Sequence, residues 1–455
     1  MEKNQGGGSR LIIKGGKVAL PAADEPVAKD IRIEGEKIVE IGDDLKGNDI
    51  LDASGLLVIP GGIDPHVHFD DPGYTEREDF YHGSMAAASG GITTVIDMPC
   101  TSVPPVTNLE NLKRKLDVVR EKSVVDYGFF GGVSAQSFEE GFPHYLEELS
   151  EYVLGFKTYF ISGMPTFERL EHHQFREVLK VTRKFDLPVL LHAEDFEFIK
   201  RASEIEKKKG NTPQNYYNSR PEIAELIAIA TAAIIAQEID ARLHIVHLGT
   251  AKAAELFNYT NLSFETAPHY LEFSVEDFIR IGSPLKVTPP VKGEGNREKL
   301  WSLLNDGKIS FVASDHAPCP EIEKNTGSIW IDYSGIPGTG TLLPYLFSEG
   351  YMKGRLSWRR FVEAISSAAA KYYGLYYRKG SIEVGKDADL VLIDPQKRWV
   401  VEGNKFFSKG KITPFEGMEF KGRIVKTIVR GRVVYDEKDG ITVEPGYGIF
   451  LKRKG

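Results

Sequence analysis

Eight short apolar segments alternate with longer amphipathic stretches through the middle of the chain, and this alternation constrains the fold most. The segments lie at 57–68, 93–99, 126–133, 154–160, 187–193, 242–248, 263–269 and 309–317. Stretches with helical periodicity separate most of them, for example 108–123, 175–186 and 296–307. Near-continuous apolar strands that alternate with helices are typical of a buried parallel sheet. Eight such units predict an α/β fold of the (β/α)₈ TIM-barrel type.

The two ends of the chain have a different pattern, in which short β-branched runs are broken by Gly and Asp. We expect both ends to form one composite β-sandwich domain from 11–60 plus 380–455. The catalytic barrel, 61–379, would then be inserted between them. We interpret 1–10 as a flexible leader without the apolar core of a signal peptide. We interpret 201–220 as a polar loop, either a plain surface excursion or a mobile lid.

Composition excludes several classes of partner. The formal net charge is −8, and acidic and basic residues are interspersed without a basic stripe, so we expect no nucleic acid. No apolar run reaches the roughly 18 to 20 residues of a membrane span, so we expect no membrane partner. The chain has two cysteines, Cys100 and Cys319, which excludes a disulfide framework and predicts a cytoplasmic location.

Polar side chains suited to metal binding lie near the ends of most predicted strands, where TIM barrels carry their chemistry. These residues are His66, His68, Lys157, His192, His247, His269 and Asp315. His66 and His68 point the same way because alternate residues of a strand share a face. Taken singly, each histidine is as well explained as a core residue and the aspartate as a turn former. Their common position favours a metal site.

Several neighbouring polar residues fit this site less well. His244 precedes His247 by three residues, so we expect it to face outward toward the helices. His316 follows Asp315 and should point away from the site. We interpret the acidic residues that flank the strand ends as supports for ligands or as structural groups, because a ligating histidine usually needs an acceptor. These acidic residues are Asp64, Asp97 and Glu194.

An ordered set of motifs over nearly the whole chain resembles the amidohydrolase superfamily, in its cyclic amidase branch of dihydroorotases, hydantoinases and allantoinases. The motifs are "PGGIDPHVHF", "GSMAAASGGITTVIDMP", "GFKTYF", "LLHAED", "SRPEIAE", "ETAPHYL", "KVTPPVK", "SDHAP" and "GIPGTGTLLP". A His-x-His pair alone is weak evidence, whereas the ordered set is highly specific.

The resemblance implies two divalent metal ions, which we expect to be zinc. It assigns one ion to His66, His68 and Asp315 and the other to His192 and His247. Lys157, carboxylated by CO₂, would bridge them and lose its buried positive charge. A hydroxide held by metals ~3.5–4 Å apart would attack the ring carbonyl. Asp315 would accept its proton and return it to the leaving nitrogen.

Departures from the relatives bear on the substrate. Dihydroorotases of this type have Arg two residues after the second His and Asn after "MP", where this chain has Asp70 and Cys100. An acidic residue disfavours the carboxylate of dihydroorotate unless Lys292 or Arg297 compensates. Hydantoinases have Tyr a few residues after the bridging Lys. At that place this chain has Ser162 and Gly163 instead, with Tyr159 only two residues on.

We therefore expect an allantoinase-like enzyme that opens a small cyclic amide or ureide ring. The alternatives are a dihydroorotase, a hydantoinase or dihydropyrimidinase, a linear amidase, a deaminase with a single metal, and a non-catalytic scaffold relative. The resemblance also implies a homodimer or homotetramer. Our candidate substrate contacts are Asp70, Cys100, Ser162, His269 and Gly338.

Overall fold

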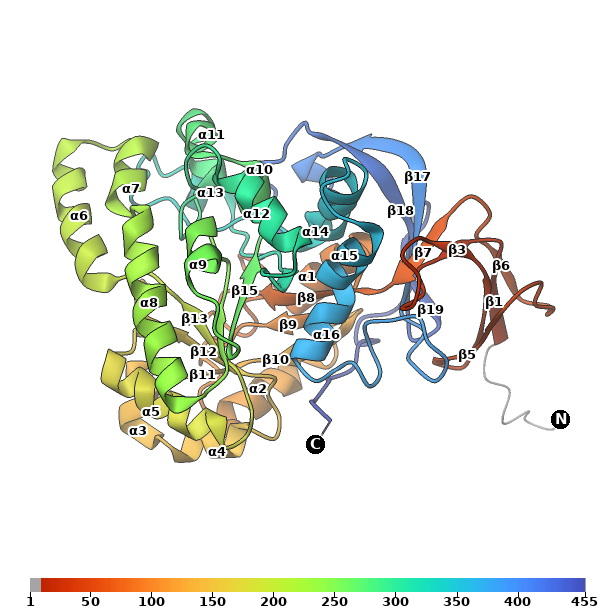
Figure 1. Ribbon diagram of the computed structural model, residues 1–455, viewed down its shortest axis with the longest axis horizontal. Helices are drawn as coiled ribbons and strands as arrows, with labels where there is room; N and C mark the ends of the chain where they lie inside the picture. Colours follow the sequence, from red (N-terminus) through yellow and green to blue (C-terminus); the bar gives the residue numbers. More distant parts are fainter. Residues whose placement is uncertain (1–9, 455) are drawn as a thin grey trace.

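The parallel strands predicted for the middle of the chain are present in the computed structural model, which describes residues 10–454 (Figure 1). They are β8 Gly62–Val67, β9 Ile92–Asp97, β10 Asp126–Phe129, β11 Gly131–Gly132, β12 Phe156–Tyr159, β13 Val189–His192, β14 Leu243–Ile245, β15 Leu262–Thr266 and β16 Phe311–Val312. One ladder runs β10–β9–β8, and the other runs from β11 to β16 in chain order. A parallel bridge between Val67 and His316 connects the first strand with the end of the last.

Two predicted strand segments are divided in the structure. The segment 57–68 gives β7, Leu57–Pro60, and β8. β7 pairs with the strands of the chain ends, whereas β8 pairs with β9. A side chain at Gly61, between them, would lie 2.1 Å from Thr93 Oγ1, so only glycine fits there. The segment 126–133 gives β10 and β11, with Phe130 between them.

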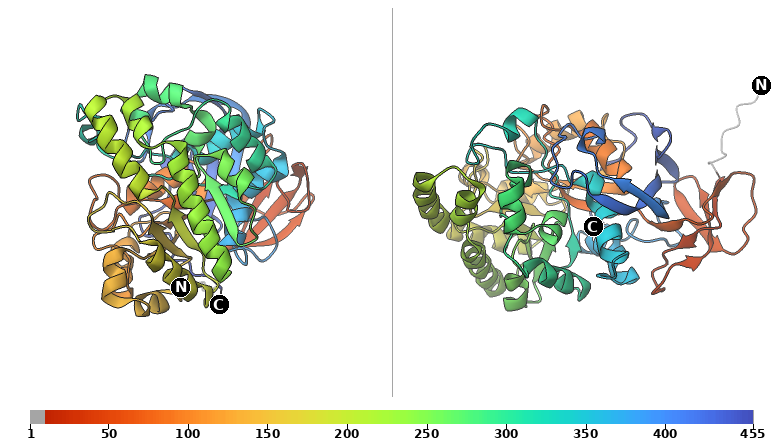
Figure 2. Two further views of the ribbon diagram at one scale, coloured as in Figure 1. Left: turned by 60° about the vertical axis from the view of Figure 1, so that its left-hand side comes forward. Right: turned by 90° about the horizontal axis from the view of Figure 1, so that it is seen from above.

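The two chain ends pair with each other, as expected. A four-stranded sheet contains β1 Arg10–Lys14, β4 Asp30–Glu34, β5 Lys37–Gly42 and β6 Ile50–Asp52. A seven-stranded sheet contains β7 with β2 Lys17–Val18, β3 Val27–Ala28, β17 Leu390–Val400, β18 Glu419–Val429, β19 Arg432–Asp436 and β20 Gly440–Ile441. β7 and β17 are antiparallel neighbours, which joins the two ends of the chain. Figure 2 shows β1–β6 at the end of the molecule away from α6 and α7. Of the predicted leader, 1–10, only Arg10 lies within the described residues, and it begins β1.

Helices follow most of the parallel strands. They are α1 Phe80–Ser89, α2 Leu109–Val119, α3 Ala135–Gly141, α4 His144–Leu149, α5 His172–Arg183, α6 Phe196–Lys209, α7 Pro213–Ser219, α8 Glu222–Ile239, α9 Ala251–Leu256, α10 Pro268–Glu272, α11 Val275–Ile281, α12 Asn296–Asn305, α13 Glu321–Lys324, α14 Thr339–Tyr345, α15 Trp358–Val362 and α16 Ala368–Tyr372. Short 3₁₀ turns lie at Ser283–Leu285 and Gly403–Lys405, and π-helical segments at Leu346–Tyr351 and Glu363–Ser367.

Helix α5 shows why these segments are helical. It buries Phe175, Val178, Leu179 and Thr182, which recur at the i, i+3, i+4, i+7 spacing of one helix face. Its last turn carries Lys180 and Arg183, whose charges complement the negative end of the helix dipole. The predicted helices at 108–123, 175–186 and 296–307 are confirmed as α2, α5 and α12.

The prediction of a polar loop at 201–220 is wrong. The segment belongs to α6 and α7, which form a helical hairpin at the edge of the molecule (Figure 1). The Asp195 side chain accepts a hydrogen bond from the Phe198 N–H and so caps α6, and Thr212 caps α7 with Pro213 in its first turn. The hairpin is polar because α6 buries little of its surface.

A buried ionic cluster connects the parallel strands with the chain ends. Lys379 Nζ lies 2.5 Å from Asp126 Oδ2, 2.6 Å from Asp389 Oδ2 and 3.0 Å from Asp387 Oδ2. Arg430 Nε lies 3.1 Å from Asp126 Oδ1. The three carboxylates could surround a cation, and the Lys379 ammonium group fills that place. The cluster lies at the amino end of β10, which begins with Asp126.

Among the described residues, no helix is both long and apolar enough to cross a membrane.

Candidate metal centre

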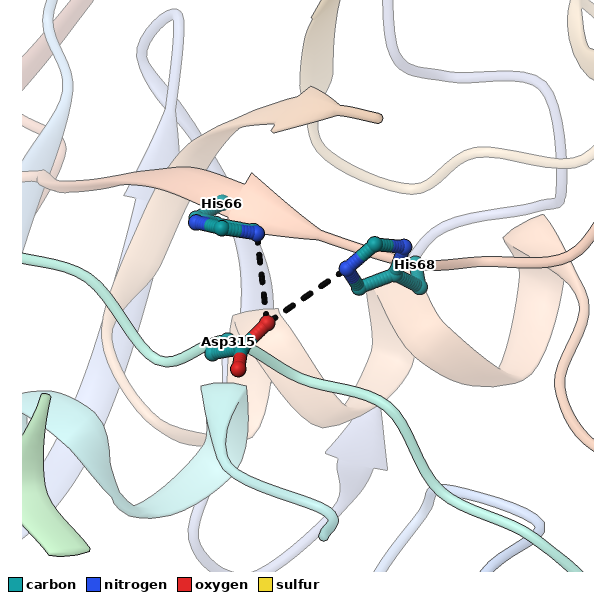
Figure 3. A group of neighbouring side chains, drawn as sticks. All are labelled: His66, His68 and Asp315. Carbon is teal, nitrogen blue, oxygen red and sulfur yellow. Dashed lines mark ion pairs between the residues drawn. The ribbon is translucent and has the colours of Figure 1, made fainter. Parts of the chain in front are cut away.

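His66, His68 and Asp315 converge on one point, as the strand-end pattern predicted. Asp315 Oδ1 lies 3.2 Å from His66 Nε2 and 3.4 Å from His68 Nε2 (Figure 3). His66 belongs to β8, His68 follows that strand, and Asp315 follows β16, so the Val67–His316 bridge brings them together. Two imidazole nitrogens and a carboxylate oxygen this close could hold one divalent cation.

His192 and His247 form a second convergent pair. His192 Nδ1 lies 3.0 Å from His247 Nε2, and both rings are buried. Glu194 Oε2 lies 2.8 Å from the other nitrogen of His192 and accepts a hydrogen bond from Arg220. Glu194 thus engages Nε2 of His192 and orients the ring, as we expected of Glu194, so that Nδ1 faces His247 and is the nitrogen placed to coordinate.

Lys157 lies inside the structure between these groups. The register places it beside Leu190 and Tyr159 beside His192, so the lysine shares the side of the sheet from which His192 projects. Lys157 Nζ is buried and has no hydrogen-bond partner. Burial lowers the pKa of Lys157 to about 8. An unpaired buried amine is unfavourable as a cation, and conversion to a carbamate would remove that charge and supply two ligand oxygens.

The donor atoms fit a binuclear centre. The ring centroids of His66 and His247 are 5.4 Å apart, so the two convergent groups are neighbours. His66 Nε2, which faces Asp315, and Lys157 Nζ are both buried without a hydrogen-bond partner. Burial lowers the pKa of His66 and of His247 well below the usual value, which keeps both rings neutral and able to coordinate.

Three residues of this region have left-handed backbone conformations that are rare outside glycine. The φ angles are +56° at Asp70, +39° at His247 and +51° at Asp315. Such conformations persist where the surroundings impose them, and they are common at functional sites. Each of these residues lies two or three positions after the end of its strand, so its side chain need not follow the strand alternation.

The structure overturns the prediction that His244 faces outward. Parallel pairing places His244 beside Leu190, which itself lies beside Lys157, so all three share one side of the sheet. β14 ends at Ile245, and the left-handed turn at His247 breaks the alternation on which the prediction relied. His316 does point elsewhere, as expected: its Nδ1 accepts from the Gly338 N–H and its Nε2 lies 3.1 Å from Glu78.

Sequence reasoning also missed Glu265. It is buried in β15, its Oε1 lies 2.6 Å from His66 Nδ1, and its Oε2 lies 3.1 Å from His244 Nε2. A carboxylate within a predicted buried strand was the available signal, because a buried charge needs partners.

The predicted roles of Asp64 and Asp97 agree with their contacts. Asp64 accepts a hydrogen bond from the Ser314 N–H, and burial raises its pKa to about 6. Asp97 accepts from the Phe69 N–H and pairs with the buried Lys115. Both carboxylates fix the backbone next to the ligands.

Asp70 and Cys100 lie beside His68. Both carboxylate oxygens of Asp70 are buried without a hydrogen-bond partner, and burial raises the pKa of Asp70 to about 8. Cys100 Sγ lies 3.9 Å from His68 Nδ1 and 3.0 Å from Tyr159 Oη. The Tyr159 ring stacks on His192 with centroids 5.4 Å apart. These residues therefore form one wall next to both histidine groups.

The other predicted substrate contacts differ in their surroundings. His269 does not end the seventh strand, because β15 stops at Thr266 and His269 belongs to α10. Both of its ring nitrogens are buried without a partner, and burial lowers its pKa to about 4. The Ser162 hydroxyl donates a hydrogen bond to Phe167 O at 2.6 Å, so its proton is engaged within the local loop and not directed at a substrate. Gly338 precedes α14, where a side chain would lie 2.9 Å from Ser314 O.

Comparisons with known proteins show which family the chain is related to. The Amidohydrolase family model matches residues 57–434. The chain is 36% identical to an allantoinase of Rubrobacter xylanophilus over 97% of each protein. It is 33% identical to an allantoinase of Enterococcus faecalis over 98% of this chain and 99% of that one. Among solved structures, it is similar to L-hydantoinase (dihydropyrimidinase) from Arthrobacter aurescens, with a TM-score of 0.91 and 32% identity over 97% of this chain and 99% of that one. The chain therefore belongs to the amidohydrolase family.

Proposed function

We propose that this protein is a metal-dependent hydrolase that opens a cyclic amide or ureide ring, with an allantoin-like ureide as its preferred substrate. The observation that carries the proposal is the convergence of two histidine groups around a buried lysine that has no partner. Similarity to allantoinases over the full length of the chain supports the reaction class.

The chain's own residues would hold two divalent ions, which we propose to be zinc because imidazole and carboxylate ligands suit it. His66, His68 and Asp315 would bind one ion, and His192 and His247 the other. Lys157, carboxylated by CO₂, would bridge them. When bound, a pair of such ions supplies Lewis acidity and lowers the pKa of water toward neutrality.

Asp315 is placed to carry the proton through the reaction. Its Oδ1 lies between His66 and His68, and its side chain is 15% exposed, so it is the least enclosed of the proposed ligands of this ion. It would accept a proton from the attacking water and deliver it to the ring nitrogen as the C–N bond breaks. The product would be an open-chain ureido acid, whose composition is that of the cyclic substrate plus one water.

The contacts of Lys292 and Arg297 give no support to the exception under which either cation would compensate for Asp70 and permit dihydroorotate. Lys292 Nζ lies 2.8 Å from Glu225 Oε2, and both side chains are buried. Arg297 donates to Glu272 O through Nη1. With these cations engaged and Asp70 beside His68, the site favours a neutral ring. Dihydroorotase and hydantoinase or dihydropyrimidinase activities remain the alternatives, and the solved structures similar to this chain include hydantoinases. A scaffold role is disfavoured by the complete ligand set.

Ring opening of allantoin, dihydroorotate and hydantoin by one zinc-loaded preparation tests the substrate. At pH values above about 8, the pKa of the buried Asp70, this side chain is an anion. There we expect kcat/KM for allantoin to exceed that for dihydroorotate by about 10²-fold or more, since a buried anionic side chain rejects a carboxylate. Asp70→Asn is the matched variant, and it should narrow this ratio above about pH 8, where it removes the charge of the ionised Asp70. A preference for dihydroorotate in the unmodified protein would contradict the substrate assignment.

We also propose the finer architecture. The parallel strands β8–β16 would form one closed (β/α)₈ barrel over 61–379. The chain ends, 11–60 and 380–455, would form a β-sandwich domain. The Val67–His316 bridge supports closure, and buried residues from both end sheets, such as Ile13, Ile31, Leu390 and Ile428, share one cluster. An experimental structure at a resolution that places the strands tests both statements.

A homodimer or homotetramer is the proposed assembly. Ile223, Ile227 and Ile234 of α8 lie within one stripe of the helix, and Ile234 is 61% exposed. Light scattering should therefore give a molar mass two or four times the 50.7 kDa mass of one chain. Ile227→Lys combined with Ile234→Lys should lower that mass, whereas Val384→Lys, also at an exposed site, should not. An unchanged mass in the double variant would exclude this face as the interface.

A cytoplasmic location is the remaining proposal. It is supported by Cys100 and Cys319, which are both free and buried. Fractionation of the producing cells tests it.

A further inference from the structure

Glu265 lies at the centre of a hydrogen-bonded chain beneath the candidate metal centre. Its Oε1 is 2.6 Å from His66 Nδ1 and also accepts the backbone N–H of His247 at 3.3 Å. Its Oε2 is 3.1 Å from His244 Nε2. His244 Nδ1 in turn lies 2.7 Å from Ser263 Oγ. One carboxylate therefore contacts a residue from each of the two convergent histidine groups.

The direction of these hydrogen bonds follows from what each ring must do. His66 Nε2 faces Asp315, so it needs a free lone pair there in order to coordinate. Its proton is then on Nδ1, which donates to Glu265. Burial lowers the pKa of His244 to about 3, so this ring is neutral and carries one proton. Placing that proton on Nε2 lets His244 donate to Glu265 and accept from the Ser263 hydroxyl.

This network distinguishes Glu265 from a carboxylate that merely fills space. The His247 backbone N–H donates to it, and the two ring nitrogens that contact it can donate in the tautomers assigned above. Two of these three groups belong to residues of the proposed metal centre. The His247 contact is to the backbone at the left-handed turn, where φ is +39°. A hydrogen bond there holds the turn that directs the His247 side chain toward His192. Glu265 thus acts on the first histidine group through a ring proton and on the second through a backbone turn.

We propose that Glu265 is a positioning residue for both halves of the metal centre, and that His244 anchors it. Glu265 would fix the tautomer and the ring orientation of His66 and the backbone turn at His247. His244 would hold the second carboxylate oxygen so that the first stays aimed at His66. The inference rests on the proposed function, because it presumes that the histidines bind metal.

Zinc affinity of the purified full-length protein tests the role. Replacing an outer partner of a metal ligand typically costs ~10–100-fold in affinity. Glu265→Gln should lower zinc affinity by about this factor, measured by competition with a chromophoric chelator, because one amide cannot accept from both rings at once. It should leave the melting temperature of the zinc-free protein near that of the unmodified protein. Glu272→Gln is the matched control, since Glu272 accepts from Tyr345 Oη and lies on α10, seven residues further along.

A pair of variants at His244 separates anchoring from packing. His244→Gln keeps an N–H donor for Glu265, whereas His244→Phe fills the space without one. We expect His244→Gln to keep zinc affinity within a few-fold of the unmodified protein, and His244→Phe to approach the loss seen in Glu265→Gln.

The outcomes separate this inference from the proposed function. If the unmodified protein binds no zinc, the proposed function fails. If it binds two zinc ions and Glu265→Gln binds them equally tightly, the positioning role is wrong while the proposed function stands. A Glu265→Gln variant whose zinc-free form melts far lower, with unchanged zinc affinity, would mean a purely structural role.

Discussion

Replacing Lys157 with alanine is expected to abolish ring opening and to reduce bound zinc from two ions to one or none. Lys157 is the residue proposed to supply the bridging oxygens, and alanine offers no ligand atom. A single electrostatic contributor to a hydrolytic site is worth about 10²–10³-fold in rate, and loss of a shared metal bridge removes more than one. We expect a fall in kcat/KM for the preferred ring on the order of 10³-fold or more. Turnover and metal content by elemental analysis provide the measurement.

Lys157→Met is the matched control, since methionine fills similar space without an amine. It should lose activity as Lys157→Ala does, which would assign the loss to the missing amine and not to the vacated space. Both variants should remain folded, because Lys157 Nζ makes no hydrogen bond that the fold would lose. Adding a short carboxylic acid to Lys157→Ala should restore part of the activity by occupying the vacated space. Full activity of Lys157→Ala without any added carboxylate would disprove the bridged two-metal site.

Replacing Asp315 with asparagine is expected to remove turnover while most of the zinc remains bound. The amide oxygen can still approach the ion beside His66 and His68, but the amide cannot take up and return a proton. General acid–base catalysis contributes about 10²–10⁴-fold, so kcat should fall by that factor. Steady-state kinetics on the preferred ring and zinc content of the same sample provide the measurement.

Asp306→Asn, the same change at an exposed position after α12, serves as the control and should leave kcat unchanged. If Asp315→Asn turns over at the unmodified rate, Asp315 does not carry the proton. If it loses zinc and activity together, its role is coordination alone.

The positions of the proposed ligands could be predicted because they depend on strand ends. Apolar runs locate parallel strands, and residues at their carboxyl ends meet at one edge whatever the intervening helices do. His66, His68 and Asp315 illustrate this, since they are brought together from opposite ends of the predicted strand series. Lys157 was recognisable because a charged side chain inside an apolar strand is costly to bury without a partner or a ligand to bind.

The errors came from places where local geometry departs from a regular pattern. The assignment of His244 assumed that strand alternation continues to His247, but β14 ends at Ile245 and a left-handed turn follows. The segment 201–220 was interpreted from its polarity alone. Its helix signals were present in Asp195 and in Thr212 followed by Pro213, and an exposed hairpin needs no apolar face. Glu265 was missed because its partners lie far away in sequence.

The ionic cluster around Lys379 has a consequence for how such a protein can change. Asp126 is the first residue of β10, whereas the histidines and Asp315 lie at or beyond the opposite ends of their strands. The charges that connect the chain ends to the strands are thus separated from the chemistry by the length of a strand. Substitutions in the loops at the carboxyl ends of the strands can adapt the site to a different substrate ring without changing the ionic cluster around Lys379. Related enzymes with this architecture can therefore change their substrate at the carboxyl ends of the strands. The ionic contacts at the amino end of β10, which hold the chain ends to the parallel strands, can stay unchanged.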